Sequence, residues 1–293
     1  MIPMKKLLSL LAAAAVAVSL ASCSPASAEG PSAPSAGTGA PSAAADESWE
    51  KVRSSGTLVL GLDKAFPPMG FVDPQTGELT GFDIDAAKEA CKRLGVELKL
   101  QPIDWDNKSA ELNNGNVDCL WNGFSKTPER AEEFALSLPY MKNRQIILVP
   151  SGSDLKGLES LKGKTVGVQA DSSAETALND NPDVKSSFQS LVKIDDYSKA
   201  VLELKNGTID AIAIDEIVAR YYLTKNAGAY AILQDQNGGD VSLATEDYVV
   251  AFRKADLALR AKIDGELEEM AKDGALAKIS EKWFGSDVTT VEK

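Results

Sequence analysis

The spacing of apolar residues over positions 58–121 predicts alternating strands and helices. Strands are expected at residues 58–62, 96–100 and 117–121, and helices at about residues 84–94 and at residues 108–113. Gly95 is expected to stop the first helix, and the last strand is expected to end at Asn122 and Gly123. A turn at residues 73–77 joins a hairpin. This order is typical of an α/β domain in which an open mixed sheet is flanked by helices.

The same order begins again in the second half of the chain. A strand is expected at residues 164–168, followed by a helix that starts at Ser172. The C-terminal part is expected to add a strand at residues 248–252 and helices at residues 257–272 and 275–283. Residues 203–210 repeat the pattern of residues 111–118 at a constant offset of 92, and each copy contains a helix end, a turn and a strand. We therefore predict two lobes of like architecture. If the lobes face each other, the loops at the carboxyl ends of their sheets line one cleft.

The N-terminal residues indicate export and attachment to a membrane. Residues 1–22 combine a short basic start with an apolar run shorter than the about 20 residues of a membrane span, and they predict a lipoprotein signal peptide. Residues 20–23 resemble a lipobox and predict a lipid on Cys23, with ordinary cleavage after Ala28 as the alternative. Residues 23–48 are rich in Ser, Ala, Pro and Gly and predict a disordered tether. The folded part is therefore expected outside the cytoplasm, anchored to the cell membrane.

The composition excludes several classes of function. The formal charge is −12, or −14 once Lys5 and Lys6 leave with the signal, and no basic run exists, so a nucleic-acid partner is not expected. The chain has no histidine, which excludes Ser-His and Cys-His catalysis and His-ligated zinc. No metal or cofactor is expected. Cys91 and Cys119 occupy apolar positions, and the sequence leaves open whether they are bridged or remain buried thiols.

The segment that follows the third predicted strand has the composition of an anion site. Ser125 supplies a hydroxyl and Arg130 a planar guanidinium that matches a carboxylate, and a helix capped by Thr127 starts between them. Free backbone N–H groups and the helix dipole favour a small anion at such a junction. The alternative is a surface turn in which Arg130 pairs with Glu132 or Glu133.

A complementary site is expected in the second lobe. The helix start at Ser172 and Ser173 offers N–H groups and hydroxyls to the same anion. Asp215 follows an apolar strand at residues 212–214, at the place that residues 122–125 hold in the first lobe. A carboxylate there pairs with an ammonium group, so the two lobes together match an α-amino acid zwitterion. The alternative for Asp215 is a helix cap.

Two aromatic residues of the first lobe are further candidates. Phe66 and Trp105 lie in predicted loops that adjoin core elements. Each either packs into the core, as aromatic residues usually do, or faces the cleft. If both face the cleft, they sandwich the ligand side chain, and a cationic or flat group gains most from that contact.

Residues 60–130 resemble the family 3 extracellular solute-binding proteins, the amino-acid receptors of ATP-driven importers. Residues 81–94, which begin with the motif GFDID, follow the signature of that family, and residues 127–130 follow its anion site. The likeness continues into the C-terminal helix and covers about residues 50–285. Ala86 departs from the pattern, because the family prefers a larger apolar residue there, and this departure concerns helix packing.

The resemblance implies a set of ligand-binding residues. They are Asp63, Phe66, Trp105, Asn122, Gly123, Ser125, Arg130, Gln169, Ser172, Ser173 and Asp215. In the family's pattern Arg130 holds the α-carboxylate bidentately, helped by Ser125 and the backbone at Gly123, and Asp215 takes the α-ammonium. The serine pair at the start of the second-lobe helix approaches the same carboxylate.

The remaining positions concern the ligand side chain. Phe66 and Trp105 would flank it, and Asp63 would lie near its far end. Asn122 stands where relatives often carry Ser, and Gln169 falls at a variable position. We expect a polar or cationic L-amino acid such as arginine or lysine, while cystine and glutamine stay open.

The resemblance also implies a two-lobed fold of the periplasmic-binding-protein type and a mechanism. Lobe 1 would comprise residues 49–142 and 248–293, and lobe 2 residues 143–247. Two hinge segments, near residues 142–145 and 245–248, would join them. The ligand stabilises the closed form because only there do both lobes touch it. The closed form, a monomer, would then dock on the membrane permease of an ABC importer.

Two other classes of protein use the same fold. One is an enzyme, such as a dehydratase that acts on prephenate or arogenate, and the other is a receptor domain that senses a ligand. Without histidine, catalysis would depend on carboxylates such as Glu175 or Glu216. We therefore expect a binding protein for transport and not an enzyme.

Overall fold

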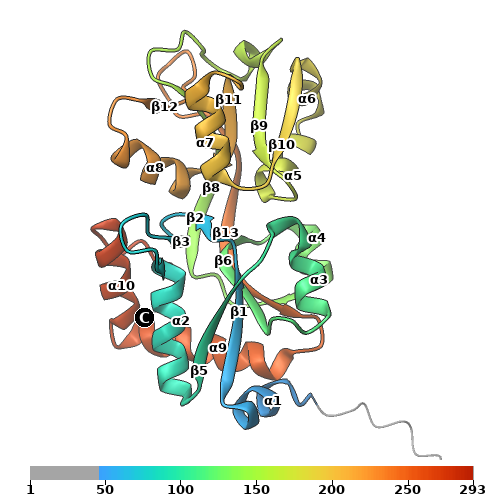
Figure 1. Ribbon diagram of the computed structural model, residues 1–293, viewed down its shortest axis with the longest axis vertical. Helices are drawn as coiled ribbons and strands as arrows, with labels where there is room; N and C mark the ends of the chain where they lie inside the picture. Colours follow the sequence, from blue (N-terminus) through green and yellow to red (C-terminus); the bar gives the residue numbers. More distant parts are fainter. Residues whose placement is uncertain (1–45, 293) are drawn as a thin grey trace, which may run out of the picture. The chain divides into compact units, whose positions relative to one another are not determined.

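The computed structural model describes residues 46–292 of the 293-residue chain. The predicted signal peptide, Cys23 and the predicted tether up to residue 45 lie outside the described residues. Within the described residues, Figure 1 shows two groups of helices, each gathered around its own strands.

Ten strands form one mixed sheet. They are β1 (Thr57–Leu62), β5 (Glu97–Pro102), β6 (Cys119–Ser125), β7 (Phe134–Leu136), β8 (Met141–Pro150), β9 (Thr165–Gln169), β10 (Ser190–Ile194), β11 (Ala211–Asp215), β12 (Tyr230–Ile232) and β13 (Ser242–Arg253). The order along the sheet is β10, β9, β11, β8, β13, β6, β1, β5, while β12 pairs with β8 and β7 with β13. A separate sheet contains β2 (Ala65–Phe66), β3 (Gly70–Val72) and β4 (Leu79–Thr80).

The helices form two groups, which we call lobe 1 and lobe 2 (Figure 1). Lobe 1, built on β1, β5 and β6, carries α1 (Ser48–Ser55), α2 (Phe82–Leu94), α3 (Lys108–Asn113), α4 (Pro128–Glu133), α9 (Leu257–Lys272) and α10 (Ala275–Phe284). Lobe 2, built on β9, β10 and β11, carries α5 (Ser173–Asn179), α6 (Pro182–Ser187), α7 (Tyr197–Asn206) and α8 (Glu216–Lys225). Short 3₁₀ turns lie at Trp105–Asn107 and Leu158–Leu161.

Two long strands connect the lobes. β8 and β13 pair antiparallel from Met141 opposite Tyr248 to Ile146 opposite Ser242. In lobe 2 β8 also pairs with β11, and in lobe 1 β13 also pairs with β6. The predicted hinge segments near residues 142–145 and 245–248 are therefore neighbouring stretches of one ladder.

The repeat found in the sequence corresponds to a repeated structural feature. Asp118 precedes β6, and its carboxylate accepts a hydrogen bond of 2.9 Å from the N–H of Val59 on β1. Asp210 precedes β11, and its carboxylate accepts a hydrogen bond of 2.7 Å from the N–H of Thr165 on β9. Each Asp thus ties the start of one strand to its parallel neighbour, because a buried backbone N–H needs an acceptor.

The core elements follow the apolar pattern closely. The predicted spans of α3 and α9 agree with the structure, and α2 stops at Gly95, which has the left-handed φ of 71°. Side chains of β1, α2 and β13 belong to the largest buried cluster, which includes Phe82, Trp121 and Tyr248. Cys91 and Cys119 are free thiols, both buried, so the structure contains no bridge between them.

Two strands run further than predicted. β6 does not end at Asn122 and Gly123 but continues to Ser125, because Phe124 and Ser125 pair with β13. Gly123 lies inside the strand with a positive φ of 56°, a conformation that suits glycine. β13 begins at Ser242 instead of residue 248, and its first half is polar, so no apolar run marks it.

Candidate functional site

Arg130 occupies the first turn of α4 with its side chain buried between the lobes. Thr127 caps this helix, and its Oγ1 accepts a hydrogen bond of 3.2 Å from the N–H of Arg130. The guanidinium lies 4.4 Å from the centre of the Phe124 ring, donates to the carbonyl of Ser125 at 3.0 Å and reaches the carbonyl of Asp171 in lobe 2 at 3.4 Å. The side chain is only 9% exposed, and burial lowers the pKa of Arg130.

The charge of Arg130 lacks a direct counter-ion in the part of the chain that the structure describes. Among residues 46–292, no carboxylate oxygen lies within 4.0 Å of the guanidinium, so the alternative pairing with Glu132 or Glu133 is wrong. A buried cation without a counter-ion is costly unless something else neutralises it. The arrangement therefore suits an external anion.

Gly123 supports this end of the site through its backbone. Its N–H donates to the carboxylate of Asp83 at 2.7 Å, so this N–H is engaged inside lobe 1 and is not the free donor that we expected. Burial raises the pKa of Asp83 to about 7. A Cβ at position 123 would lie 2.6 Å from the ring of Phe66, which explains why the close approach requires glycine.

Asp215 is the last residue of β11 in lobe 2, and its side chain is only 2% exposed. Its Oδ1 accepts hydrogen bonds from Asn143 at 2.7 Å, Gln145 at 2.8 Å and the hydroxyl of Tyr248 at 2.7 Å. Tyr197 donates to Oδ2 at 3.4 Å. All four partners are neutral, and within the described part of the chain no Lys or Arg lies within 4.0 Å of this carboxylate.

The surroundings of Asp215 favour a ligand group over a structural cap. Burial raises its pKa to about 7, which means that the ionised form lacks enough compensation. Asp215 is the N-cap residue of α8 by position, but among the described residues its carboxylate accepts no capping hydrogen bond from that helix. Its side chain is instead bound by the strands that connect the lobes.

Arg130 and Asp215 belong to one hydrogen-bonded network. Gln145 of β8 donates to Asp215 and, at 3.0 Å, to the hydroxyl of Ser173 in lobe 2. Ser173 in turn donates at 3.0 Å to the hydroxyl of Ser125 in lobe 1. Because the carbonyl of Ser125 accepts from Arg130, the network links the two charges across the lobes.

The other predicted residues divide into two groups. Asp63 of lobe 1 accepts a hydrogen bond of 2.6 Å from Gln169 of lobe 2, and burial raises the pKa of Asp63 to about 6. The ring of Phe66 lies 5.7 Å from that of Tyr197, also across the lobes. Ser172 caps α5: its hydroxyl donates to the carbonyl of Gln169 and accepts from the N–H of Glu175.

Trp105 and Asn122 are buried at the margins of this network. Trp105 packs 6.0 Å from Phe124 and lies beside Lys108, whose ammonium pairs with Asp171 of lobe 2. Asn122 points toward Gly70, and neither atom of its amide has a hydrogen-bond partner among the described residues. No hydrogen bond joins Asn122 to Arg130 or Asp215 in the described part of the chain.

The connecting strands contribute residues that were not predicted from the sequence. Asn143 and Gln145 of β8 and Glu246 and Tyr248 of β13 occupy alternate positions and surround Asp215. Their signal in the sequence is a continuous polar run in each connecting stretch, at residues 142–145 and 245–247, but only the strand register shows which side chains face inward.

Two general findings constrain the chemistry of residues 46–292. In this range no three Cys, Asp or Glu side chains are grouped so that they could hold a metal ion. None of its helices has both the length and the apolar character that crossing a membrane requires.

Known proteins are similar to this chain in both sequence and fold. The L-cystine-binding protein TcyJ of Escherichia coli (strain K12) is 34% identical over 244 residues, which cover 82% of this chain and 86% of TcyJ. The arginine-binding extracellular protein ArtP of Bacillus subtilis (strain 168) is 30% identical over 229 residues, covering 78% and 86%.

A solved structure extends the likeness to three dimensions. The substrate-binding protein of an ABC uptake transporter from Streptococcus pneumoniae, with bound histidine, is 37% identical and covers 85% of this chain and 100% of its own, with a TM-score of 0.78. The family model for bacterial extracellular solute-binding proteins, family 3, matches residues 58–286. Since that match includes both lobes and both connecting strands, the chain belongs to the family 3 bacterial extracellular solute-binding proteins.

Proposed function

We propose that the chain binds a free L-α-amino acid between its lobes and delivers it to an ABC-type importer. One observation carries the proposal: a buried guanidinium and a buried carboxylate lie in one network, and neither has a counter-ion among the described residues. An α-amino acid brings one carboxylate and one ammonium, so it neutralises both. Charge-assisted hydrogen bonds of this kind are about twice as strong as neutral ones.

Each end of the ligand then belongs to one lobe. Arg130 and the hydroxyl of Ser125 bind the α-carboxylate from lobe 1, and Ser173 approaches it from lobe 2. Asp215 binds the α-ammonium from lobe 2. A ligand held this way stabilises the closed arrangement, because an open molecule can offer it only one of the two charges.

Residues other than Arg130 and Asp215 select the side chain of the ligand. Asp63 contributes a carboxylate, and Phe66 contributes an aromatic face. This combination favours a polar or cationic side chain. The named ligands of the relatives, L-cystine, arginine and histidine, are consistent with that preference.

The same proposal places the protein at the outer surface of the cell membrane as a monomer. Cys23 would carry the lipid, and the segment that follows it would tether the lobes near the permease. The chain is proposed to transport its ligand unchanged. The relatives described above are named as binding proteins, which supports this reading over a dehydratase.

A thermal-shift panel tests the binding function directly. The purified protein is melted alone and with each common L-amino acid and L-cystine. At a hundred times its dissociation constant, a ligand adds about 2.7 kcal/mol of stability, so we expect a clear rise in Tm for arginine, lysine, histidine or cystine. If no amino acid raises Tm, the proposed function is wrong. Turnover of prephenate or arogenate would establish the enzyme instead.

A further inference from the structure

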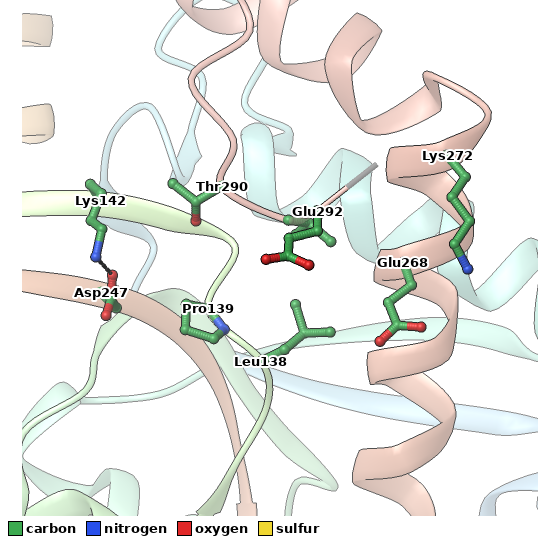
Figure 2. A pocket seen from close by; sticks show the side chains of 9 residues that line it. Leu138, Pro139, Lys142, Asp247, Glu268, Lys272, Thr290 and Glu292 are labelled. Atoms are coloured by element: carbon green, nitrogen blue, oxygen red, sulfur yellow. Dashed lines mark ion pairs between the residues drawn. The ribbon is translucent and has the colours of Figure 1, made fainter.

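Glu246 lies on β13, one of the two strands that connect the lobes. Side chains alternate along a strand, so Glu246 shares a side with Tyr248, whose hydroxyl contacts Asp215, while Asp247 faces the other way. Figure 2 shows Asp247 with its partner Lys142 at a separate pocket of about 640 Å³. Two adjacent carboxylates of one strand therefore point to different places.

The carboxylate of Glu246 meets that of Asp215 at a single nitrogen atom. Nε2 of Gln145 lies 2.9 Å from Oε2 of Glu246, 2.8 Å from Oδ1 of Asp215 and 3.0 Å from the Ser173 hydroxyl. A primary amide has only two hydrogens, so it cannot satisfy all three acceptors at once. The two carboxylates thus lie close together and share one neutral donor.

More acceptors than donors surround this point. The amide oxygens of Asn143 and Gln145 are buried, and neither accepts a hydrogen bond from any described residue. Within residues 46–292, no Lys or Arg nitrogen lies within 4.0 Å of the Glu246 carboxylate. The missing component is a group with several donors and a positive charge.

We propose that Glu246 is a second ligand-binding carboxylate, which binds the α-ammonium of the amino acid together with Asp215. This inference rests on the proposed function and adds a residue to it. An ammonium has three N–H donors, so it can donate hydrogen bonds to both carboxylates and to one amide oxygen. Among residues 46–292, no Lys or Arg side chain does this.

The pair also affects which ligand is bound. Arg130 offsets the ligand carboxylate, and the α-ammonium offsets one of the two acids, which leaves one negative charge. A ligand with a second positive charge compensates it, and an acidic ligand adds to it. Glu246, which lies on the connecting strand β13, therefore selects for cationic amino acid ligands. It is distant in sequence from every residue that the family pattern implied.

Burial, together with the charge of the nearby Glu246, raises the pKa of Asp215 to about 7, so near neutral pH Asp215 holds a proton for part of the time. The charged or titratable groups that face the pair are Arg130 from α4, Tyr197 from α7 and Tyr248 from β13. When the ammonium arrives it replaces that proton. Binding near neutral pH should therefore release up to about one proton per ligand.

Titration calorimetry with L-arginine, L-histidine and L-cystine as probes measures both affinity and proton release. Each titration is run near neutral pH in two buffers that differ in ionisation enthalpy. We compare the wild type with Glu246→Gln, Glu246→Asp and the neighbouring control Asp247→Asn. Glu246→Gln is expected to weaken binding about tenfold and to release fewer protons. Glu246→Asp retains the release, and Asp247→Asn resembles the wild type.

Each other result overturns a defined part of the account. Equal affinity and equal proton release for Glu246→Gln and the wild type contradict the role of Glu246. Tighter binding by Glu246→Gln also contradicts it, because the acid would then compete with the ligand carboxylate for Arg130. If the wild type binds but releases no proton, the proposed contact between the α-ammonium and Asp215 is wrong, whether or not the variants fold. A wild type that binds none of these probes, and no other L-amino acid of the thermal-shift panel, overturns the proposed function and this inference with it.

Discussion

The two lobes have the same scaffold and opposite charges at their inner ends. Asp118 in lobe 1 and Asp210 in lobe 2 make equivalent bonds to the N–H groups of Val59 and Thr165. At the carboxyl ends of the strands that follow, lobe 1 presents Arg130 and lobe 2 presents Asp215. Repetition thus explains how the lobes fold, and the departure from repetition explains what they bind.

The repeated and the non-repeated charges also differ in their partners. The repeated Asp residues are satisfied by backbone donors of their own lobe. The inner charges are buried without counter-ions among the described residues, and Asp215 depends on neutral donors from the connecting strands. A charge that the fold leaves uncompensated is the one available to a ligand.

Removing the positive charge of Arg130 should have the largest effect on the affinity for the amino acid. Arg130→Ala leaves the buried ligand carboxylate without its partner, and we expect a loss of roughly 2–5 kcal/mol. Calorimetry with L-arginine measures the loss, and Arg93→Ala on the outer surface of lobe 1 is the matched control. Agmatine lacks the carboxylate and is cationic at both ends, so its affinity should not fall with Arg130→Ala. Normal affinity of Arg130→Ala for L-arginine would refute the assignment.

Removing the negative charge of Asp215 should have a smaller effect on this affinity. Asp215→Asn keeps a side chain of the same shape but loses the charge, and we expect a loss of about 2 kcal/mol in affinity for L-arginine. Asp180→Asn, on the exposed end of α5, is the control. An unchanged affinity of Asp215→Asn would break the comparison between the two ends.

Asp215 should also affect how the stability of the ligand-free protein depends on pH. Burial raises the pKa of Asp215 from 3.8 to about 7, so the folded state holds a proton that the unfolded chain releases. Its contribution to stability is present below pH 4 and is lost as pH rises toward 7. Relative to Asp215→Asn, the wild type should therefore lose stability over this window. Urea unfolding at several pH values checks this, and parallel curves for the two proteins would contradict it.

The repeated Asp residues should affect folding and leave binding unchanged. Asp118→Asn and Asp210→Asn each weaken one hydrogen bond, at a cost of about 1 kcal/mol in the free energy of unfolding. Asp118→Asn should cost more, because Arg253 lies 3.6 Å from this carboxylate. Denaturation and calorimetry on both variants test this difference. A loss of affinity comparable to that of Asp215→Asn would show that scaffold and site are not separate.

The sequence predicted the scaffold best where buried apolar residues mark an element. The helix at Leu257–Lys272 has a periodic apolar face, and the strand at Ala211–Asp215, buried at every position, contains an unbroken apolar run. The polar first half of β13 was missed, because its pairing with β8 is a tertiary contact that leaves no apolar run. The extension of β6 through Gly123 was missed for the same reason.

The candidate site was predictable in its charges and not in its surroundings. Arg130 and Asp215 stand at ends of recognisable elements, so their positions follow from the α/β order. Glu246 and Gln145 depend on strand register, and Asp83 depends on a contact 40 residues away in sequence with Gly123. A single sequence does not determine such pairings.

The most direct test of the central claim is a crystal structure of the protein with the amino acid that gives the largest rise in Tm. We predict that the α-carboxylate lies within about 3.2 Å of the Arg130 guanidinium and that the α-ammonium contacts the Asp215 carboxylate. A ligand bound elsewhere, or one whose carboxylate points away from Arg130, would contradict the account.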